Sequence, residues 1–449
     1  MLDTIAVIST AFGKGALSIV RMSGSEAIEI ANKLFKGKNL KKVKSHTVHY
    51  GHIYDGQEII DEVLLSVFKA PKTFTREDIV EISCHGGIFV TNKILELLLL
   101  HGARLAQPGE FTKRAYINGR IDLTQAEAVS DIIEARTKSS LRYANRGLRG
   151  DIKKLIEGFR SRVLTCIASI EVNIDYPEYD DEQQITNEII IPILKTLLTQ
   201  IDDIIKKSEA SLIIKEGIKT AIIGKPNVGK SSLLNSLLRE DKAIVTNVAG
   251  TTRDTVEGMV GVGGVILNLI DTAGIRETSD LVEKIGVEKT KEIINIAELI
   301  ILVFDYSSKL DKEDLEILNL TKDKVRIIVV NKQDLNKEID LNQLNDYLLI
   351  STFNPSDIDK LESKINEVTN ISNITDIDHT YLGNARQIAK LKEAKNHLST
   401  AFDSANANQI IDIVNIDLTL AWKALGEIIG EENPEDLLDE MFSKFCLGK

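Results

Sequence analysis

Short apolar runs separated by turn-forming residues dominate the first 118 positions of the chain, and they predict a sheet. The runs with strand character cover residues 4–9, 16–21, 47–53, 63–68 and 79–83. Between them, apolar positions recur every three or four residues over 26–34 and 88–100, which predicts two helices. Residues 1–118 are therefore expected to form a compact α+β domain.

A helical period replaces this pattern from residue 119 to about residue 215. Ile152, Ile156, Phe159 and Val163 follow one another at three- and four-residue steps, as on one face of an amphipathic helix. The same period returns over 372–449. We expect both stretches to form one all-α helical domain, whose second part ends in the tail FCLGK.

Residues 216–371 alternate strand-like and helical segments instead. Apolar runs lie at 218–223, 265–270, 299–304, 325–330 and 348–351. Strands that alternate with helices form a doubly wound, mostly parallel sheet. The predicted fold class is multidomain α/β, with this α/β domain inserted into the helical domain.

Charge limits the partners of the molecule. The 55 Lys and Arg residues against 67 Asp and Glu residues give a net charge of -12, so the surface as a whole repels nucleic acid and any RNA contact must be local. In contrast to this negative net charge, one stretch of the chain is basic; it contains Lys33, Lys36, Lys38, Lys41, Lys42 and Lys44. It is either a contact for RNA phosphates or a solvated loop.

Three widely separated cysteines, Cys84, Cys166 and Cys446, fit a reducing compartment better than a disulfide framework. The apolar runs are too short for a membrane helix. The start, MLDTIAVIST, lacks the basic region of a secretory signal. We expect a cytoplasmic protein with no membrane contact.

A phosphate-binding motif follows the apolar run at 218–223. The segment GKPNVGKS, from Gly224 to Ser231, matches G-x-x-x-x-G-K-[ST] and leads into a predicted helix. Backbone amides of such a loop enclose phosphate, Lys230 reaches the outer phosphates and Ser231 supplies a Mg²⁺ ligand. The expected contacts are Asn227, Val228, Gly229, Lys230, Ser231 and Ser232.

Two further motifs end later strand-like runs. An acidic side chain in the first can hold Mg²⁺ while a glycine amide meets the γ-phosphate, and its members are Asp271, Thr272, Ala273 and Gly274. The second consists of Asn331, Lys332, Gln333 and Asp334. A carboxylate at Asp334 can accept hydrogen bonds from N1 and N2 of guanine, a donor pair that adenine lacks. Together the motifs resemble the Ras-like GTPases, so we expect GTP as substrate, with Ser351 and Thr352 near the base.

The segment between the phosphate loop and DTAG lies where GTPases place the threonine that completes Mg²⁺ coordination. Thr252 is the candidate and Thr251 the alternate; the segment's expected nucleotide contacts are Thr246, Asn247, Val248, Ala249, Gly250, Thr251 and Thr252. Ile275 occupies the place of the usual water-orienting glutamine. Asn227 can instead help to place a potassium ion in the role of an arginine finger. Glu277 and Glu283 either position the attacking water or are solvated loop charges.

Distinctive motifs are spread along the whole chain: IVRMSG at 19–24, EDIVEISCHGG at 77–87, GEFTKRAYINGRIDLTQAEA at 109–128, the inserted GKPNVGKSSLLN and DTAGIRE, and FCLGK at 445–449. With these motifs the chain resembles, from end to end, the bacterial and organellar tRNA-modification GTPases called MnmE or TrmE. The resemblance implies a folate-binding N-terminal domain that forms a homodimer, a helical domain, and a Ras-like P-loop G domain activated by potassium-dependent pairing. It also implies a flavin-binding partner of the MnmG or GidA type, in a heterotetramer.

The activity implied by the resemblance is GTP hydrolysis coupled to modification of the wobble uridine of certain tRNAs. A carboxymethylaminomethyl or aminomethyl group is added to C5, with a one-carbon unit from tetrahydrofolate. The 5,10-methylene form is the expected donor and the 5-formyl form a binding probe. Glycine and ammonium both stay open as the source of the amine.

The resemblance also assigns site residues by motif. The folate contacts are Arg21, Glu81, Arg120 and Lys449; the potassium ligands are Asn227, Thr246, Val248 and Thr251; the Mg²⁺ ligands are Ser231 and Thr252. Glu283 is the candidate for ordering the attacking water. A carboxylate and several cations complement a pterin edge and a glutamate tail. Cys446 is either a nucleophile or proton donor, or part of a packing anchor.

A second function stays open on the nucleotide motifs alone. Regulatory GTPases of ribosome assembly or translation share all three of them, because one fold hosts many functions. The two ends of the chain distinguish the alternatives, since RMSG and FCLGK have no role in a plain switch.

Overall fold

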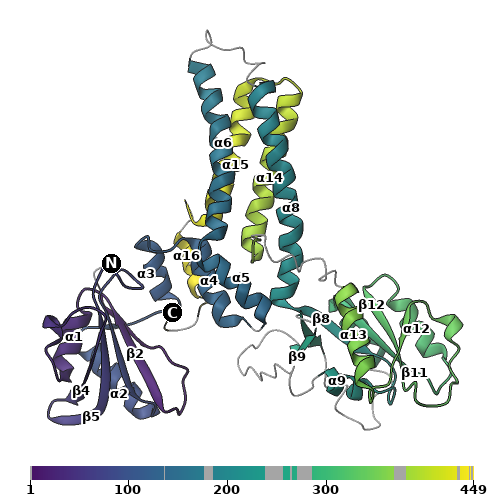
Figure 1. Cartoon of the computed structure of the whole chain (residues 1–449), viewed down its shortest axis with the longest axis horizontal. Coiled ribbons are helices and arrows are strands. Elements are labelled where there is room, and N and C mark those ends of the chain that lie inside the picture. The colour runs from purple at the N-terminus through teal and green to yellow at the C-terminus, as the bar shows by residue number, and fades with distance from the viewer. Residues whose placement is uncertain are drawn as a thin grey trace. The chain divides into compact units, whose positions relative to one another are not determined.

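The computed structural model describes residues 3–135, 137–175, 186–237, 256–262, 265–270, 286–368, 381–431, 435–443, 445 and 448 (Figure 1). The chain divides into two compact units. The first comprises Met1–Ile133, Gly147–Ser161 and Trp422–Lys449, and the second comprises Glu134–Arg146 and Arg162–Ala421.

A seven-stranded sheet forms the centre of the first unit, in the order β3-β4-β5-β6-β2-β1-β7. Its strands are β1 (Ile5–Ile8), β2 (Leu17–Ser23), β3 (Phe35–Lys36), β4 (Thr47–Asp55), β5 (Glu58–Phe68), β6 (Ile79–His85) and β7 (Arg104–Leu105). Neighbouring strands are antiparallel, except that β1 and β7 are parallel. The five strands predicted from the apolar runs are confirmed.

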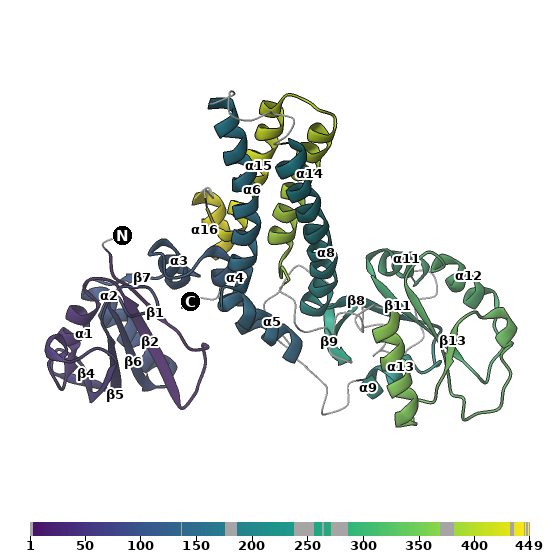
Figure 2. The same cartoon turned by 45° about the horizontal axis from the view of Figure 1, so that its top comes forward.

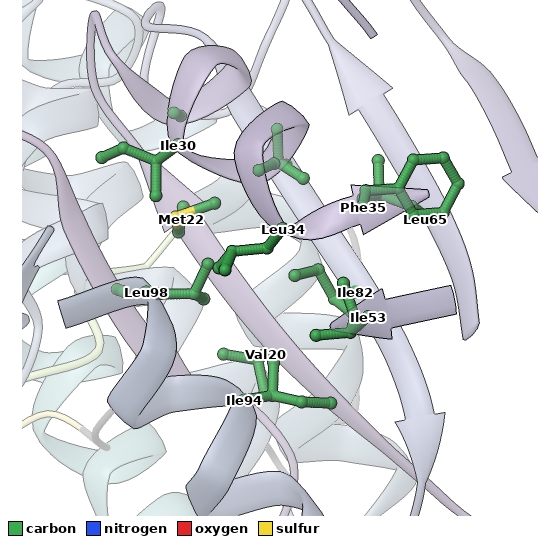
Figure 3. Packing of buried hydrophobic residues seen from close by; sticks show 14 of the residues in the cluster. Val20, Met22, Ile30, Leu34, Phe35, Ile53, Leu65, Ile82, Ile94 and Leu98 are labelled. Carbon is green, nitrogen blue, oxygen red and sulfur yellow. The ribbon is translucent and has the colours of Figure 1, made fainter. Parts of the chain in front are cut away.

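Two helices, α1 (Ala27–Leu34) and α2 (Ile88–Leu100), pack on one face of this sheet. Figure 3 shows Ile30 of α1 beside Met22 of β2 and Ile94 of α2 beside Val20 of the same strand. Side chains alternate between the two faces of a strand. Arg21 and Glu81, which pair in register between β2 and β6, therefore point to the face opposite the helices.

The end of the chain belongs to the same unit as its beginning. Helix α16 (Glu435–Ser443) packs near α3 (Glu110–Ile117) and α4 (Leu123–Glu134), with Phe442 against Leu123 and Ala126. At Gly109, where φ is +68°, an added Cβ would lie only 2.4 Å from the carbonyl oxygen of Phe442. This close approach admits only glycine.

The second unit contains a six-stranded sheet in the order β13-β12-β11-β8-β10-β9. The strands are β8 (Ile218–Ile223), β9 (Val256–Val262), β10 (Val265–Ile270), β11 (Leu299–Asp305), β12 (Arg326–Asn331) and β13 (Tyr347–Leu349). All pairs are parallel except β9 with β10. The five predicted strands are confirmed, whereas β9 was not predicted.

Helices separate the strands of this sheet, as expected for a doubly wound domain. They are α9 (Lys230–Leu237), α11 (Gly286–Ile296), α12 (Lys312–Leu320) and α13 (Pro355–Val368). Cores lie on both faces, one including Leu233 and Ile301 and the other including Ile300 and Ile328. The carboxyl end of the interior strand β8 leads directly into the phosphate loop.

Long helices flank the inserted domain in sequence, which confirms the helical prediction. They are α5 (Lys138–Leu148), α6 (Asp151–Asp175), α8 (Ile191–Glu216), α14 (Ala385–Asn406) and α15 (Ile411–Ile429). Within the second unit, α8 and α14 run side by side (Figure 2) and are joined by ion pairs, including Lys395 with Asp202 at 2.6 Å. The short turns are η1 (Leu40–Lys42), the π-helical η2 (Thr186–Ile190) and η3 (Leu341–Gln343).

Within the described ranges, no helix combines the length and the apolar composition needed to cross a membrane.

Candidate functional site

The phosphate loop passes so close to neighbouring strands that two of its positions admit only glycine. A Cβ on Gly224 would lie 2.3 Å from the carbonyl oxygen of Val303 in β11. A Cβ on Gly229, where φ is +99°, would lie 2.1 Å from Nδ2 of Asn331 at the end of β12. The two glycines therefore fix the loop against the carboxyl ends of the parallel strands, where α/β proteins bind ligands.

Lys230 is the first residue of α9 and folds back over this loop. Its Nζ donates to the carbonyl oxygens of Gly224 and Lys225, both at 2.6 Å. Burial lowers the pKa of Lys230. A desolvated ammonium group beside a helix N-terminus is a strong site for phosphate oxygens, and Ser231 follows it in the first turn of α9.

Asn331 joins three loops that are distant in sequence. Its side chain is almost fully buried, with Nδ2 donating to the carbonyl oxygen of Val228 at 3.0 Å and Oδ1 accepting from the amide of Thr352 at 3.3 Å. The structure therefore brings together the phosphate loop, the NKQD motif and the loop at 351–352. A buried amide with satisfied donors and acceptors holds such loops in one arrangement.

Lys332 has a left-handed backbone, with φ at +65°. Its Nζ lies 2.6 Å from Oδ2 of Asp305, the last residue of β11. Asp305 in turn accepts from the amide and hydroxyl of Ser307, at 2.8 and 2.7 Å. Burial alone would raise the pKa of Asp305, but the hydrogen bonds from Lys332 and Ser307 outweigh burial and hold it below its ordinary value.

A second carboxylate, Asp357 of α13, organises the rest of the region predicted to contact the base. Asp357 is buried and accepts from the amide of Ser351 at 3.1 Å and from Nε2 of Gln333. Asp334, the residue expected to read guanine, is exposed beside them. Asp305 and Asp357 were not found by sequence reasoning. The position of Asp305 at the end of an apolar run was the available signal.

Lys225 in the phosphate loop forms a further contact that its sequence position did not indicate. Its Nζ pairs with Asp311 and, at 2.7 Å, with Asp314. Asp311 also caps α12 by accepting from the amides of Glu313 and Asp314, at 3.0 and 3.2 Å. The N-terminus of α12 thus holds the outer side of the phosphate loop.

Several predicted site residues lie outside the described residues, so their assignments stay predictions. These are Thr246, Asn247, Val248, Ala249, Gly250, Thr251, Thr252, Asp271, Thr272, Ala273, Gly274, Glu277, Glu283, Cys446 and Lys449. Asn227 is the one expected potassium ligand within the described ranges, and it is exposed on the loop with φ at +64°.

Three of the four predicted folate residues share one pocket in the first unit. The pocket has a volume of about 650 Å³, and its lining includes Arg21, Glu81 and Arg120. Arg21 donates to Oε1 of Glu81 from Nε at 2.8 Å and from NH2 at 2.7 Å. Both contacts use Oε1, and among the described residues no hydrogen bond or ion pair uses the second oxygen of Glu81, which can accept from a ligand. The guanidinium of Arg120 lies 4.9 Å from the ring centroid of Phe74.

Gly448, near the carboxyl terminus, contacts a residue of this pocket. Arg21 NH1 donates to the carbonyl oxygen of Gly448 at 3.3 Å, next to the predicted contact Lys449. An added Cβ at Gly448, where φ is +93°, would lie 3.0 Å from Cα of Ser9. Gly448 thus contacts Arg21 of the pocket and closely approaches Ser9, just after β1, which accounts for a glycine in FCLGK.

A phosphate loop between a parallel strand and a helix, tied by a buried asparagine to an NKxD motif, defines a P-loop GTPase. Comparisons with known proteins agree. The model described as "GTP-binding protein TrmE N-terminus" matches residues 4–120, and "MnmE helical domain" matches residues 123–446.

Full-length relatives support the same assignment. The "tRNA modification GTPase MnmE" of Acholeplasma laidlawii (strain PG-8A) is 53% identical over 451 residues, covering 100% of this chain and 99% of the relative. The proteins of that name from Lactococcus lactis subsp. cremoris (strain MG1363) and Streptococcus pyogenes serotype M2 (strain MGAS10270) are each 50% identical, covering 100% of this chain and 98% of each relative. The chain belongs to the MnmE family and is a GTPase.

Proposed function

We propose that the protein hydrolyses GTP with potassium as an activator and that this hydrolysis serves tRNA modification in the cytoplasm. As a homodimer, together with a flavin-binding subunit of the MnmG or GidA type, it adds a carboxymethylaminomethyl or aminomethyl group to C5 of the wobble uridine. The one-carbon unit comes from tetrahydrofolate. The observation that carries this proposal is the pocket in which Arg21, Glu81 and Arg120 converge beside the tail.

In the nucleotide site, each described residue has a defined task. Lys230 and the amides of the phosphate loop hold phosphate oxygens, Ser231 offers a hydroxyl to Mg²⁺, and Asp334 accepts from N1 and N2 of guanine. Mg²⁺ and K⁺ supply positive charge that offsets the charge developing on the phosphates. Asn227 suits the potassium ion because it is exposed on the phosphate loop and its side chain carries an amide oxygen.

In the N-terminal pocket, the charges match a reduced folate. A pterin presents an edge of N–H donors similar to that of guanine. The second oxygen of Glu81 can accept a hydrogen bond from this edge. Arg21 and Arg120 can bind the carboxylates of the glutamate tail or the pterin carbonyl. The bound folate supplies a one-carbon unit, whereas the pocket residues bind and orient it.

Two measurements on the full chain test the proposal. GTP turnover is measured in KCl and in NaCl, each with and without folate, and binding of 5-formyltetrahydrofolate is measured by calorimetry. We expect faster turnover in KCl and saturable folate binding. Equal turnover in both salts contradicts the potassium role, and absence of folate binding contradicts the pocket's role.

A further inference from the structure

An uninterrupted basic segment precedes and enters β4 of the first unit. Residues 33–54 contain six lysines and no Asp or Glu, although the whole chain has a net charge of -12. Lys33 and Lys41 both face Glu29, at 4.0 and 3.4 Å. Lys36 lies over the ring of Tyr54, 3.6 Å from its centroid. Half of the lysines in the segment therefore have a partner within the fold.

The other three lysines surround one hollow. Lys38, Lys42 and Lys44 line a concavity of about 410 Å³ together with Asn39, Thr47 and His49, and we call it the lysine hollow. All three lysines are exposed. Among the described residues, none of their ammonium groups pairs with a carboxylate. Three like charges placed around one concavity repel each other, and an anion relieves this repulsion.

The backbone that presents these lysines is fixed before any ligand binds. Leu40 is fully buried, and its amide donates to Oδ1 of Asn32 at 2.8 Å. Asn39 caps the turn by accepting from the amide of Lys41 at 3.0 Å. The hydroxyl of Thr47 donates to the carbonyl oxygen of Lys44 at 2.7 Å. Only lysine side chains must be ordered on binding, so little backbone entropy is lost.

The hollow adjoins the pocket assigned to folate. His46, with φ at +62°, lines that pocket, whereas Lys44 and Thr47 on either side of it line the lysine hollow. On the neighbouring segment, Lys69 donates to the carbonyl oxygen of Lys41 at 3.3 Å, and Lys72 lines the folate pocket. Positive charge therefore continues from the hollow to the pocket.

We propose that the lysine hollow binds phosphate groups of the tRNA backbone and holds the RNA next to the folate pocket. The hollow has lysines without arginines, and lysines act as point charges that neutralise phosphates regardless of sequence. Because the chain as a whole has a net charge of -12 and repels RNA, a strip of lysines without carboxylate partners in the described ranges is a favoured contact for RNA phosphates. The inference rests on the proposed role in tRNA modification and names where the RNA is held.

The test compares two triple variants of the full chain that change the charge equally. Lys38→Gln, Lys42→Gln and Lys44→Gln together remove the hollow's charge. Lys154→Gln, Lys195→Gln and Lys423→Gln form the control, because these lysines are exposed on α6, α8 and α15. The affinity for unmodified tRNA is measured from about 50 to 200 mM KCl, the range over which phosphate contacts lose much of their strength.

We expect the hollow variant to bind tRNA about ten- to a hundredfold more weakly at the low-salt end. The plot of log K against log salt should also become less steep, with the magnitude of its negative slope reduced by about 2 to 3. The control variant keeps the wild-type slope to within about 1. Replacing the same three lysines by arginine keeps the binding. GTP turnover without tRNA and binding of 5-formyltetrahydrofolate stay unchanged in all variants, which excludes misfolding.

Three results overturn the inference. One is a hollow variant with the wild-type affinity and slope while wild type binds tRNA, which leaves the proposed function intact. Another is an equal loss in the control variant, which reduces the effect to net charge. The third is selective displacement of tRNA by inorganic phosphate at matched ionic strength, which makes the hollow a small-anion site. Wild type that binds no tRNA contradicts the proposed function as well.

Discussion

Asp305 holds the ammonium group of Lys332 at 2.6 Å, across the boundary between the neighbouring strands β11 and β12. Ser307 fixes Asp305 from the other side through its amide and hydroxyl. The long side chain of Lys332 is therefore placed before a nucleotide arrives. Placing a lysine in advance avoids an entropy loss of about 1–2 kcal/mol on binding.

Replacing Asp305 by Asn should therefore weaken binding and leave chemistry unchanged. We expect Asp305→Asn to raise the Kd of both GTP and GDP by about tenfold, because 1.4 kcal/mol corresponds to a factor of ten, with kcat near wild type. Fluorescent-nucleotide titration and turnover assays measure the two quantities. Asp346→Asn is the control, because Asp346 pairs with Lys364 at 3.3 Å on an exposed surface. A fall in kcat with unchanged Kd would contradict this role for Asp305.

Glycine at position 229 should be essential for nucleotide binding. Gly229→Ala places a methyl group 2.1 Å from Nδ2 of Asn331 and strains a backbone with φ at +99°. We expect GTP affinity to fall by about ten- to a hundredfold, since such strain costs about 1–3 kcal/mol. Gly158→Ala in α6 is the matched control, where nothing lies within 4 Å, and it should stabilise the helix by about 0.5–1 kcal/mol. Wild-type GTP affinity in Gly229→Ala would show that the loop is not held as described.

Folate binding should depend on Glu81 and Arg21. GTP hydrolysis should not depend on these two residues. Glu81→Gln removes the charge that the pterin edge needs and leaves Arg21 without its 2.7 Å ion pair. We expect 5-formyltetrahydrofolate to bind at least about tenfold more weakly, while basal GTP turnover is unchanged. Calorimetry measures the binding. The control is Glu96→Gln, on the opposite, helix-covered side of the sheet, which should bind folate as wild type does. An equal loss of folate affinity in this control would contradict the pocket as the binding site.

Acid should destabilise the first unit through Glu110. This buried carboxylate accepts from Arg104 at 2.6 Å and from Arg114 at 3.1 Å. Burial alone would raise the pKa of Glu110, but the hydrogen bonds from Arg104, the Gln107 amide and Arg114 outweigh it and hold the pKa below its ordinary value. Its stabilising contribution is therefore complete above the unfolded-state pKa of about 4.3 and is lost as the pH falls through the folded-state pKa.

The role of Glu110 is tested by hydrogen exchange, which measures the opening free energy of the α3 amides from neutral pH down to the lowest pH at which the protein stays folded. Glu110→Gln should lower their opening free energy by about 1–3 kcal/mol near pH 7, with a smaller difference from wild type at low pH. Glu29→Gln, a partly exposed carboxylate paired with Lys41 at 3.4 Å, is the control and should change little. A difference that grows as the pH falls would contradict the sign.

The apolar pattern correctly predicted those strands whose side chains are buried on both faces of the sheet. The run Ile218–Ile223 and the run Leu299–Asp305 are buried on both faces, so their composition identifies them as strands. Strand β9, with the sequence VEGMVGV, was missed because its two glycines weaken the strand pattern. Helix α3 was missed because its apolar positions are few and its buried side chains include Arg114 and Glu110.

The candidate site was predictable in its motifs but not in the contacts that hold them. Lys332 and Asp334 follow from the NKxD spacing, whereas the partner of Lys332 lies 27 positions earlier in sequence and is brought close by the pairing of β11 with β12. The lysine hollow likewise depends on the turn at Leu40 and on its closeness to the pocket lined by Arg21 and Glu81, neither of which the sequence indicates. Thr252 and Glu283 stay predictions, because they lie outside the described residues.

The most direct measurement of the central claim is a change of base specificity at Asp334. Xanthine keeps the N1 donor of guanine but replaces the N2 donor by a carbonyl oxygen, which an amide nitrogen can satisfy. We predict that Asp334→Asn loses at least about a hundredfold in kcat/KM for GTP and gains turnover of xanthosine triphosphate, with ATP unused by either protein. Unchanged GTP turnover in Asp334→Asn, or ATP hydrolysis by wild type at the GTP rate, would contradict a guanine-specific site in the inserted domain.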